Sequence, residues 1–515
     1  MDLNTFFNIR RRVGTLFLQY VLNCDRQITD ESSLEELDFS NQQIGILSEL
    51  RGLIKKSERT SASSPLYDVS TLFIINGLTK ESRFNELRKM CGGEILTIHS
   101  TDAIENFIFE YAIKIYPVLL FMPNEEYHFH QWVHTNQVMQ ESISFIKLLK
   151  KDPTLSKLVV SDESYSRFIY LLDNGALVSS TEPTIIVDFI YRCFINCCYR
   201  MDFAPARLIQ EIRSNLEILK KIALGEEFEY SCFRGLYGMG IRKMESFECY
   251  HNVVIRPISS LENPLFCIRK TASILGNDGG VIGAILELKQ KTKGISTPKG
   301  NISSTFTSPA LTEIISLLKF SIVFSTGIVS APFNETFYDI SLPLHSSLLN
   351  SREMTQGTTT IIDSENCTEI ISWLELLKKN DLGHLKVPLK RLQYAIFERL
   401  DPEDSLLDAF IAWEGIFSSK FETTFQVTGA IAKFLEENPA KRQAFFKRLQ
   451  HLYSLRSFIA HGEPREHKET KGENIHDIRN EVIAIAVNCL KKLLQTPELL
   501  KLRPKERVKT LLVFS

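Results

Sequence analysis

The sequence predicts a multidomain α+β protein with a mixed, mostly helical N-terminal region, a β-rich middle domain and an all-α helical bundle at the C-terminus. Its 515 residues are too many for one hydrophobic core. Apolar residues make up 44% of the chain and charged residues 24%, a composition that excludes disordered, collagen-like and coiled-coil proteins. The residue pattern changes near positions 225 and 385, so we expect three units, residues 1–225, 226–384 and 385–515.

The first unit mixes helical segments with short strand-like runs. Apolar residues recur at helical spacing in residues 15–24, 140–150, 185–198 and 205–224, whereas residues 116–122 and 157–160 are short apolar runs typical of strands. The unit contains no motif that we connect with catalysis. We therefore expect a regulatory or sensor region.

The compartment is predicted from what the chain carries near its start and in its most apolar stretches. Residues 1–5, which include an acid and two polar residues, and the short apolar run after Arg10 to Arg12 do not fit a secretory signal. Residues 185–199 and 314–329 contain charged side chains and are short for a membrane span. The ten cysteines are scattered, as is typical of reduced cytosolic thiols. We expect a cytoplasmic protein without a membrane partner.

The middle unit is rich in β-prone residues separated by turns. Residues 247–255, 267–274 and 281–288 are such runs, and Gly, Asn and Pro residues lie between them. A polar linker is expected at residues 290–308.

The C-terminal unit has clear helix boundaries. Asp401 is a suitable N-cap and Pro402 a suitable first helical residue, so a helix is expected from there to about Ser418. Asn438 and Pro439 repeat this pattern and open a helix that Gly462 closes. Residues 478–493 keep apolar side chains at helical spacing. These elements predict a compact helical bundle.

The helix before Gly462 carries an arginine among its apolar positions. At about 100° per residue, Arg456 falls on one stripe with Leu449 and Leu452. A guanidinium keeps its charge and needs a carboxylate or phosphate partner in such surroundings. Glu414 lies in an apolar segment of the neighbouring helix and is the predicted partner, so the pair has either a structural or a catalytic role.

His461 is the predicted proton carrier, because histidine titrates near neutral pH. It lies five residues after Arg456, about 140° around an ideal helix, so one unbroken helix points the two side chains apart. Either the backbone turns at Gly462 or a second copy of the chain supplies its own pair. A histidine at a helix C-terminus can also simply stabilise the helix dipole.

The same helix is strongly basic between residues 441 and 461 and carries no acid. A basic face is usually only solvated, but with histidine and tyrosine it also suits RNA. The candidate RNA-binding residues are Lys441, Arg442, Lys447, Arg448 and His451.

Residues Tyr453 to Gly462 resemble the closing motif of the HEPN superfamily, in which an arginine precedes a histidine by four to six residues. Residues 391–395 and 401–414 are similar to the earlier helices of its Apea-like branch, so the resemblance covers about residues 385–500. It implies a homodimer that cuts RNA without a metal or other cofactor, with His461 as general acid/base and Arg456 neutralising phosphate charge. Glu414, Ser457 and Tyr453 would be supporting residues, although the superfamily often has Asn, Asp or His at the position of Ser457.

The predicted function is therefore a regulated endoribonuclease, a toxin or anti-phage defence effector of bacteria. Its expected partners are RNA, such as tRNA or mRNA, a second copy of the chain, and a phage-derived trigger or an inhibitory partner. The alternative is a HEPN domain that only dimerises, scaffolds a partner or binds RNA.

Four other patterns have less specific explanations. The histidines of residues 128–134 have spacings that suit zinc, but a Trp and a Phe lie among them and no cysteine cluster accompanies them, so no metal is expected. Glycines at 235–240 lack the setting of a phosphate loop. Cysteines at 193–198 are expected in a core. The basic tail, residues 500–515, either packs within a dimer or contacts RNA.

Overall fold

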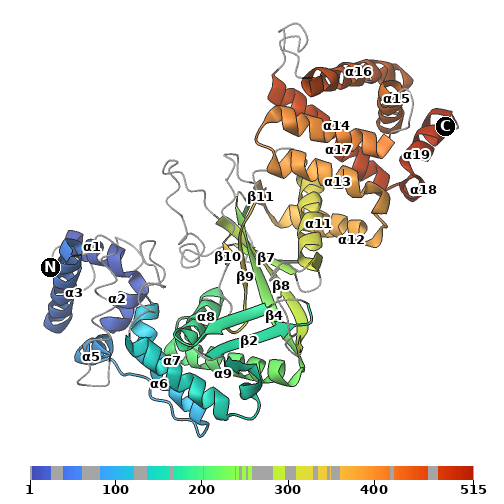
Figure 1. Ribbon diagram of the computed structural model, residues 1–515. Helices are drawn as coiled ribbons and strands as arrows, with labels where there is room; N and C mark the ends of the chain where they lie inside the picture. The colour runs from blue at the N-terminus through green and yellow to red at the C-terminus, as the bar shows by residue number, and fades with distance from the viewer. Residues whose placement is uncertain are drawn as a thin grey trace.

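The computed structural model is a mixed α+β fold with an antiparallel sheet in the middle and an all-helical C-terminal region, as the sequence predicts. In Figure 1 the N-terminal and C-terminal helices lie at opposite ends of the molecule, with the sheet between them. The structure describes the following residues: 3–24, 39–60, 82–120, 136–161, 166–174, 177–200, 202–237, 239–242, 246–250, 253–257, 282–295, 309–328, 334–344, 348–349, 360–417, 423–461 and 474–513. All structural statements below concern these residues.

The N-terminal region is built mainly from helices. They are α1 (Leu3–Val13), α2 (Thr15–Val21), α3 (Asn41–Thr60), α5 (Arg83–Met90), α6 (Ala103–Leu119), α7 (Asn136–Lys151), α8 (Ile185–Tyr199) and α9 (Pro205–Leu224), with a short 3₁₀ turn η3 (Leu155–Leu158). The strand expected at 116–122 is wrong where the structure describes it, because residues 116–119 are the last turn of α6. Asp102 caps this helix by accepting hydrogen bonds from the amides of Ile104 and Glu105.

The central sheet has nine strands among the described residues, and every pairing in it is antiparallel. The main path runs β1-β2-β8-β4-β9-β10. The strands are β1 (Val159–Ser161), β2 (Ser166–Leu172), β3 (Leu177–Thr181), β4 (Glu227–Tyr237), β6 (Phe247–Tyr250), β7 (Val253–Pro257), β8 (Ile282–Ile295), β9 (Asn334–Ile340) and β10 (Leu348–Leu349). The expected strand at 267–274 lies outside the described residues.

Two boundaries expected from the sequence do not match the sheet. Leu172 of β2 pairs with Gly294 of β8, so the boundary near residue 225 falls inside one sheet. Strand β8 also extends to Ile295 and occupies the first part of the expected linker. Gly294 allows α9 to approach this strand, because a Cβ there would lie 2.1 Å from the carbonyl oxygen of Ile222.

The C-terminal helices include two that the sequence pattern did not predict. They are α11 (Pro309–Thr326) and α12 (Ser364–Lys379), which pack against each other, and α11 also contacts α17. Strand β11 (Thr360–Ile362) pairs in parallel with β5 (Met239–Ile241) and leads into α12. Gly235 thus lies within β4 and Gly240 within β5, so these glycines belong to strands and not to a phosphate loop that opens a helix.

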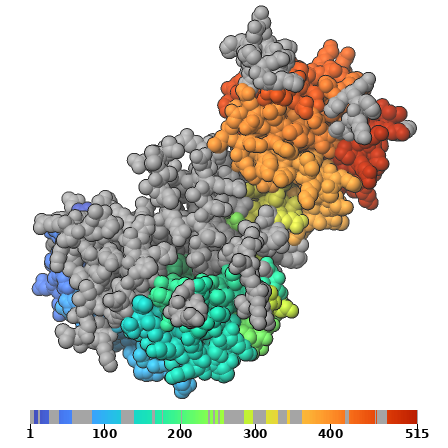
Figure 2. Space-filling model, viewed as in Figure 1, coloured from blue at the N-terminus to red at the C-terminus, as the bar shows by residue number. Residues whose placement is uncertain are grey.

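The remaining elements form the helical bundle, which projects as a separate lobe in Figure 2. They are η4 (Gly383–Leu385), α13 (Lys386–Gln393), the π-helical turn η5 (Tyr394–Glu398), α14 (Pro402–Phe417), α15 (Thr423–Leu435), α16 (Pro439–His461), α17 (Ile475–Leu494), α18 (Pro497–Leu500) and α19 (Pro504–Val513). The helices expected at 402–418, 439–461 and 478–493 are confirmed. Asp401 and Asn438 cap the first two as predicted, through their side-chain oxygens.

The basic tail packs on its own chain. Helix α19 contacts α14 and α15, and the buried Arg507 donates hydrogen bonds to the carbonyl oxygens of Leu499, Leu500 and Ile416. Burial lowers the pKa of Arg507 to about 10. Across the described ranges, no helix is long and apolar enough to cross a membrane.

Candidate active site

Helices α14 and α16 bring Glu414, Tyr453 and Arg456 together. Arg456 Nε lies 2.9 Å from Glu414 Oε1, and Arg456 Nη2 donates a longer hydrogen bond of 3.4 Å to Glu414 Oε2. Tyr453 donates its hydroxyl proton to Glu414 Oε1 at 2.5 Å. The predicted pairing of Glu414 with Arg456 is therefore present, and Tyr453 is a second hydrogen-bond donor to the same carboxylate. We call these three residues the carboxylate cluster.

Arg456 is more exposed than its position on the apolar stripe predicted. Leu449 and Leu452 on that stripe are fully buried, but the side chain of Arg456 is 37% exposed and that of Glu414 21%. Position on the stripe fixes only the angle of a residue around the helix, and a long arginine side chain can bury its stem while its guanidinium reaches solvent. Its Nη1 has no hydrogen-bond partner among the described residues. One face of the guanidinium can thus meet an anion from solvent.

The surroundings hold Tyr453 in its protonated form. Burial raises the pKa of Tyr453, and its hydrogen bond to Glu414 and the negative charge of that residue raise it further. The ring packs edge-on against Phe410, and the guanidinium carbon of Arg456 lies 5.8 Å from the ring centre. Tyr453 therefore acts as a fixed donor that orients the carboxylate of Glu414.

The position of His461 relative to Arg456 follows from the helix. Helix α16 is continuous from Pro439 to His461, so the two positions are separated by about 7.5 Å along the axis and about 140° around it. The side chain of His461 lies outside the described residues, as does Gly462. Ser457 is exposed and is not part of the carboxylate cluster. The structure thus assembles the arginine half of the predicted pair within one chain.

The five predicted RNA-binding residues of α16 have different surroundings. Lys441 and Lys447 are exposed. Arg442 donates to the carbonyl oxygens of residues 436 and 437 after α15, and Arg448 forms an ion pair with Glu481 of α17 at 2.5 Å. His451 is half-buried, and its Nε2 is buried without a hydrogen-bond partner in the described part of the chain. The two arginines hold helices together, which leaves the lysines as the freer cations.

A second ion cluster, which the sequence pattern did not predict, surrounds Asp408 of α14. Asp408 is buried and accepts from Arg391 Nη1 and Arg399 Nε, each at 2.8 Å. The two arginines lie on either side of η5, and Ser405 and Arg479 donate to the carbonyl oxygen of Ala395 within it. An aspartate inside the apolar stripe of α14 was the available indication, since a buried carboxylate needs cationic partners.

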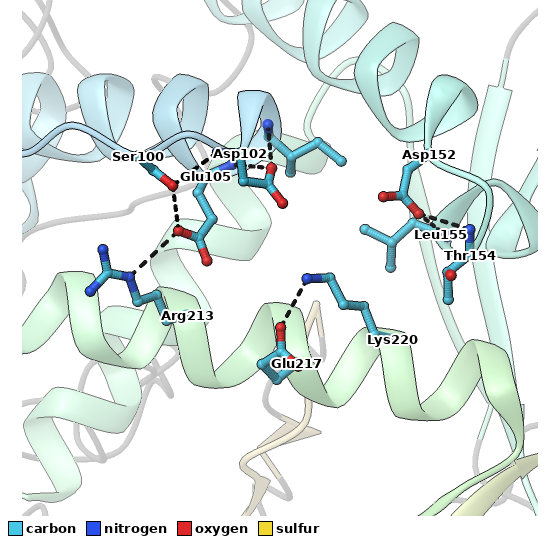
Figure 3. Close-up of polar contacts among 10 residues, drawn as sticks. Ser100, Asp102, Glu105, Asp152, Thr154, Leu155, Arg213, Glu217 and Lys220 are labelled. Atoms are coloured by element: carbon cyan, nitrogen blue, oxygen red, sulfur yellow. Dashed lines mark hydrogen bonds and ion pairs between the residues drawn. The ribbon is translucent and has the colours of Figure 1, made fainter.

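A further group of charged residues lies where α6 and the turn after α7 face α9 (Figure 3). Lys220 pairs with Glu217 at 2.9 Å, and Glu217, Asp102 and Glu105 all raise its pKa. Glu105 accepts from Ser100 and pairs with Arg213, while Asp152 caps a turn. These carboxylates are already bound by lysine, arginine, hydroxyl or amide groups. Within the ranges described, no group of His, Cys, Asp and Glu is arranged to hold a metal ion.

Two other candidates from the sequence have limited support. Residues 128–134, with the three histidines, lie outside the described residues. Cys193, Cys197 and Cys198 are buried on α8 as expected. Burial and the charge of Glu211 raise the pKa values of Cys193 and Cys197, which disfavours the reactive thiolate.

No protein-family model, curated protein or solved structure matches this chain. Any assignment of activity therefore depends on the residues themselves, and the carboxylate cluster is the arrangement that best fits a chemical role.

Proposed function

We propose that this protein is a metal-independent endoribonuclease of the HEPN type, acting as a regulated toxin or anti-phage effector in bacteria. The observation that carries the proposal is the guanidinium of Arg456, which Glu414 orients from one side while the other side stays open to solvent. A planar guanidinium held in this way offers fixed donors to a phosphate. The motif that ends at His461 supplies the proton carrier in this proposal.

The reaction proceeds by internal transesterification. The 2′-hydroxyl oxygen attacks the adjacent phosphorus atom while the bond between phosphorus and the 5′ oxygen breaks. His461 accepts the proton of the attacking 2′-hydroxyl and delivers a proton to the departing 5′ oxygen, while Arg456 stabilises the charge that develops on the phosphoryl oxygens. The products carry a 2′,3′-cyclic phosphate and a 5′-hydroxyl. No cofactor takes part in these steps.

The separation of Arg456 and His461 around α16 favours a homodimeric site. In one chain the two positions point about 140° apart, whereas two facing copies of the 456–461 segment would place one chain's histidine near the other chain's arginine. Activity should then require the dimer.

Regulation by the rest of the chain is supported by the contacts of α11 and α12 with the bundle. Lys491 of α17 donates to the carbonyl oxygen of Phe324 at the end of α11 and lies 5.3 Å from the ring centre of Trp373 of α12. Because β11 joins the sheet immediately before α12, these helices connect the sheet with the bundle. They are the proposed route by which a trigger acts on the site.

The test is expression of wild type, Arg456→Ala and His461→Ala in a bacterial host, with total RNA analysed on gels and the new ends identified chemically. His99→Ala, an exposed histidine before α6, is the matched control. We expect wild type and the control to arrest growth and to produce 2′,3′-cyclic phosphate ends, and the two site variants to do neither. Cleavage by wild type should also persist in excess chelator. Cleavage by His461→Ala at the wild-type rate would refute the assignment of the proton carrier.

The second candidate is a module that binds RNA or a partner without cleaving. It is favoured by the charge balance of the carboxylate cluster, since Glu414 already neutralises Arg456. Absence of cleavage under any trigger, together with RNA binding that persists in Arg456→Ala, would select it.

A further inference from the structure

A basic surface of the helical lobe outside α16 lies on the end of α12, the turn after it and α13. Between residues 378 and 393 the chain carries five lysines and arginines and one acid, Asp381. Lys379, Lys386 and Lys390 are exposed, as is His384. Such a run differs from the alternating charges of an ordinary solvated face, because α13 itself contains no carboxylate.

Lysines and an aromatic ring follow one stripe of this helix. Lys386, Lys390 and Tyr394 are four residues apart, and helical positions at that spacing share a face. Lys390 Nζ lies 5.7 Å from the ring centre of Tyr394, which is half-buried. A cationic stripe that ends on an aromatic ring is the arrangement used to bind the phosphates and stack the bases of single-stranded nucleic acid.

Arg391 extends the basic surface beside this stripe. Its side chain is 39% exposed, Nη1 donates to the buried Asp408, and its Nε and Nη2 have no hydrogen-bond partner among the described residues. At the other end of η5, Arg399 is exposed but is surrounded by acids, since Glu398 and Asp404 act on it together with Asp408. We therefore place the basic surface from Lys386 to Arg391.

We propose that α13 and η5 form an RNA-binding surface, with Lys386, Lys390 and Arg391 contacting phosphates and Tyr394 stacking a base. The choice of RNA as the ligand rests on the proposed function. Arg442 and Arg448 of α16 are less suited to this role, because Arg442 already donates to the carbonyl oxygens of residues 436 and 437 and Arg448 is paired with Glu481. An RNA bound along α13 would be anchored away from the carboxylate cluster, on the other side of α14.

The experiment measures binding separately from cleavage. The full-length chain carrying Arg456→Ala, which removes the proposed phosphate contact at the site, is titrated with a labelled single-stranded RNA of mixed sequence at several salt concentrations. Lys386→Glu with Lys390→Glu should weaken binding about tenfold or more and lower the salt slope by about 1.4, since each lost phosphate contact contributes about 0.7 for single strands. Tyr394→Ala should weaken RNA binding about tenfold, whereas Tyr394→Phe, which keeps the aromatic ring, should bind RNA like its parent.

The matched control is Lys147→Glu with Lys151→Glu, two exposed lysines at the same spacing on α7. This change of charge is identical, so any general effect on RNA binding appears in both variants. The inference is overturned if the α7 variant weakens binding as much as the α13 variant, or if the α13 variant binds RNA like its parent, as it would if the surface served an acidic protein. Loss of RNA binding in the α13 variant alone supports the RNA-binding surface, even if wild type never cleaves RNA. If wild type cleaves RNA but the α13 variant binds RNA like its parent, only the proposed nuclease function is supported.

Discussion

The strength of the Glu414–Arg456 pair can be predicted from its geometry. At 2.9 Å, opposite charges attract by about 1.4 kcal/mol in water and about 5.7 kcal/mol at an effective dielectric constant of about 20. Because 37% of the Arg456 side chain and 21% of the Glu414 side chain are exposed, solvent screening lowers the coupling energy towards the upper end of the range measured for exposed ion pairs. We expect a coupling energy of about 1 to 2 kcal/mol in a double-mutant cycle of Glu414→Gln and Arg456→Met.

The two single variants should differ in how strongly they destabilise α16. Arg456→Met leaves the carboxylate of Glu414, the less exposed partner, with only the hydroxyl of Tyr453, and should destabilise α16 by about 2 kcal/mol. Glu414→Gln leaves an amide oxygen that still accepts from Tyr453, and the guanidinium can turn to water, so we expect about 1 kcal/mol. Tyr453→Phe removes the donor but keeps the ring contact with Phe410, and is the matched control for packing.

The assay is amide hydrogen exchange of α16 peptides in the full-length protein, because local opening energies do not require two-state unfolding of the whole chain. A coupling below about 0.3 kcal/mol would be within the error of additivity and would refute the view that Glu414 holds the guanidinium. A larger cost for Glu414→Gln than for Arg456→Met would refute the argument from unequal exposure.

Three further changes test the fold. Arg507→Met should destabilise the docking of α19 by about 3 kcal/mol, because three buried carbonyl oxygens lose their donor, and thermal unfolding together with proteolysis of the tail measures this. Gly294→Ala should cost about 3 kcal/mol through its clash with Ile222, while Gly45→Ala, with no atom within 4 Å, should not destabilise; equal melting temperatures would contradict the close approach. Burial raises the pKa of Tyr20 to about 12, so its protonated hydroxyl contributes fully to stability below about pH 10, and this contribution is lost as the pH rises through 12. Unfolding curves measured at increasing alkaline pH should therefore shift less for Tyr20→Phe than for wild type.

The helices of the C-terminal bundle could be predicted because local residues set their ends. Asp401 and Asn438 accept amide hydrogen bonds at the first turns of α14 and α16, and this capping depends on only the next few residues. The expected strand at 116–122 failed because a short apolar run does not distinguish a strand from the last turn of a buried helix. Its N-cap, Asp102, lies too far upstream for that window to include it.

The cluster around Asp408 could not be predicted because it depends on an irregular helical turn and on a contact between residues far apart in the sequence. The π-helical turn η5 adds a residue per turn, which alters the spacing between Arg391 and Arg399 relative to an α-helix. Its carbonyl group at Ala395 is satisfied by Arg479 of α17, about eighty positions later in the chain. By contrast, Glu414 could be paired with Arg456 from sequence because each is the charged residue of an otherwise apolar helical segment.

The charge of the carboxylate cluster gives a physical reason for the proposed dimer beyond the angle between Arg456 and His461. Glu414 cancels the charge of Arg456, so a phosphate entering one chain's cluster meets an oriented donor but no net positive field. Attraction must then come from other cations, either a second copy of α16 with its exposed Lys441 and Lys447 or the surface of α13. Arg507 differs in being wholly buried on carbonyl oxygens, which fits a structural role. Orientation by Glu414 and attraction by separate cations are thus divided between different residues, and the proposed cleavage would require both.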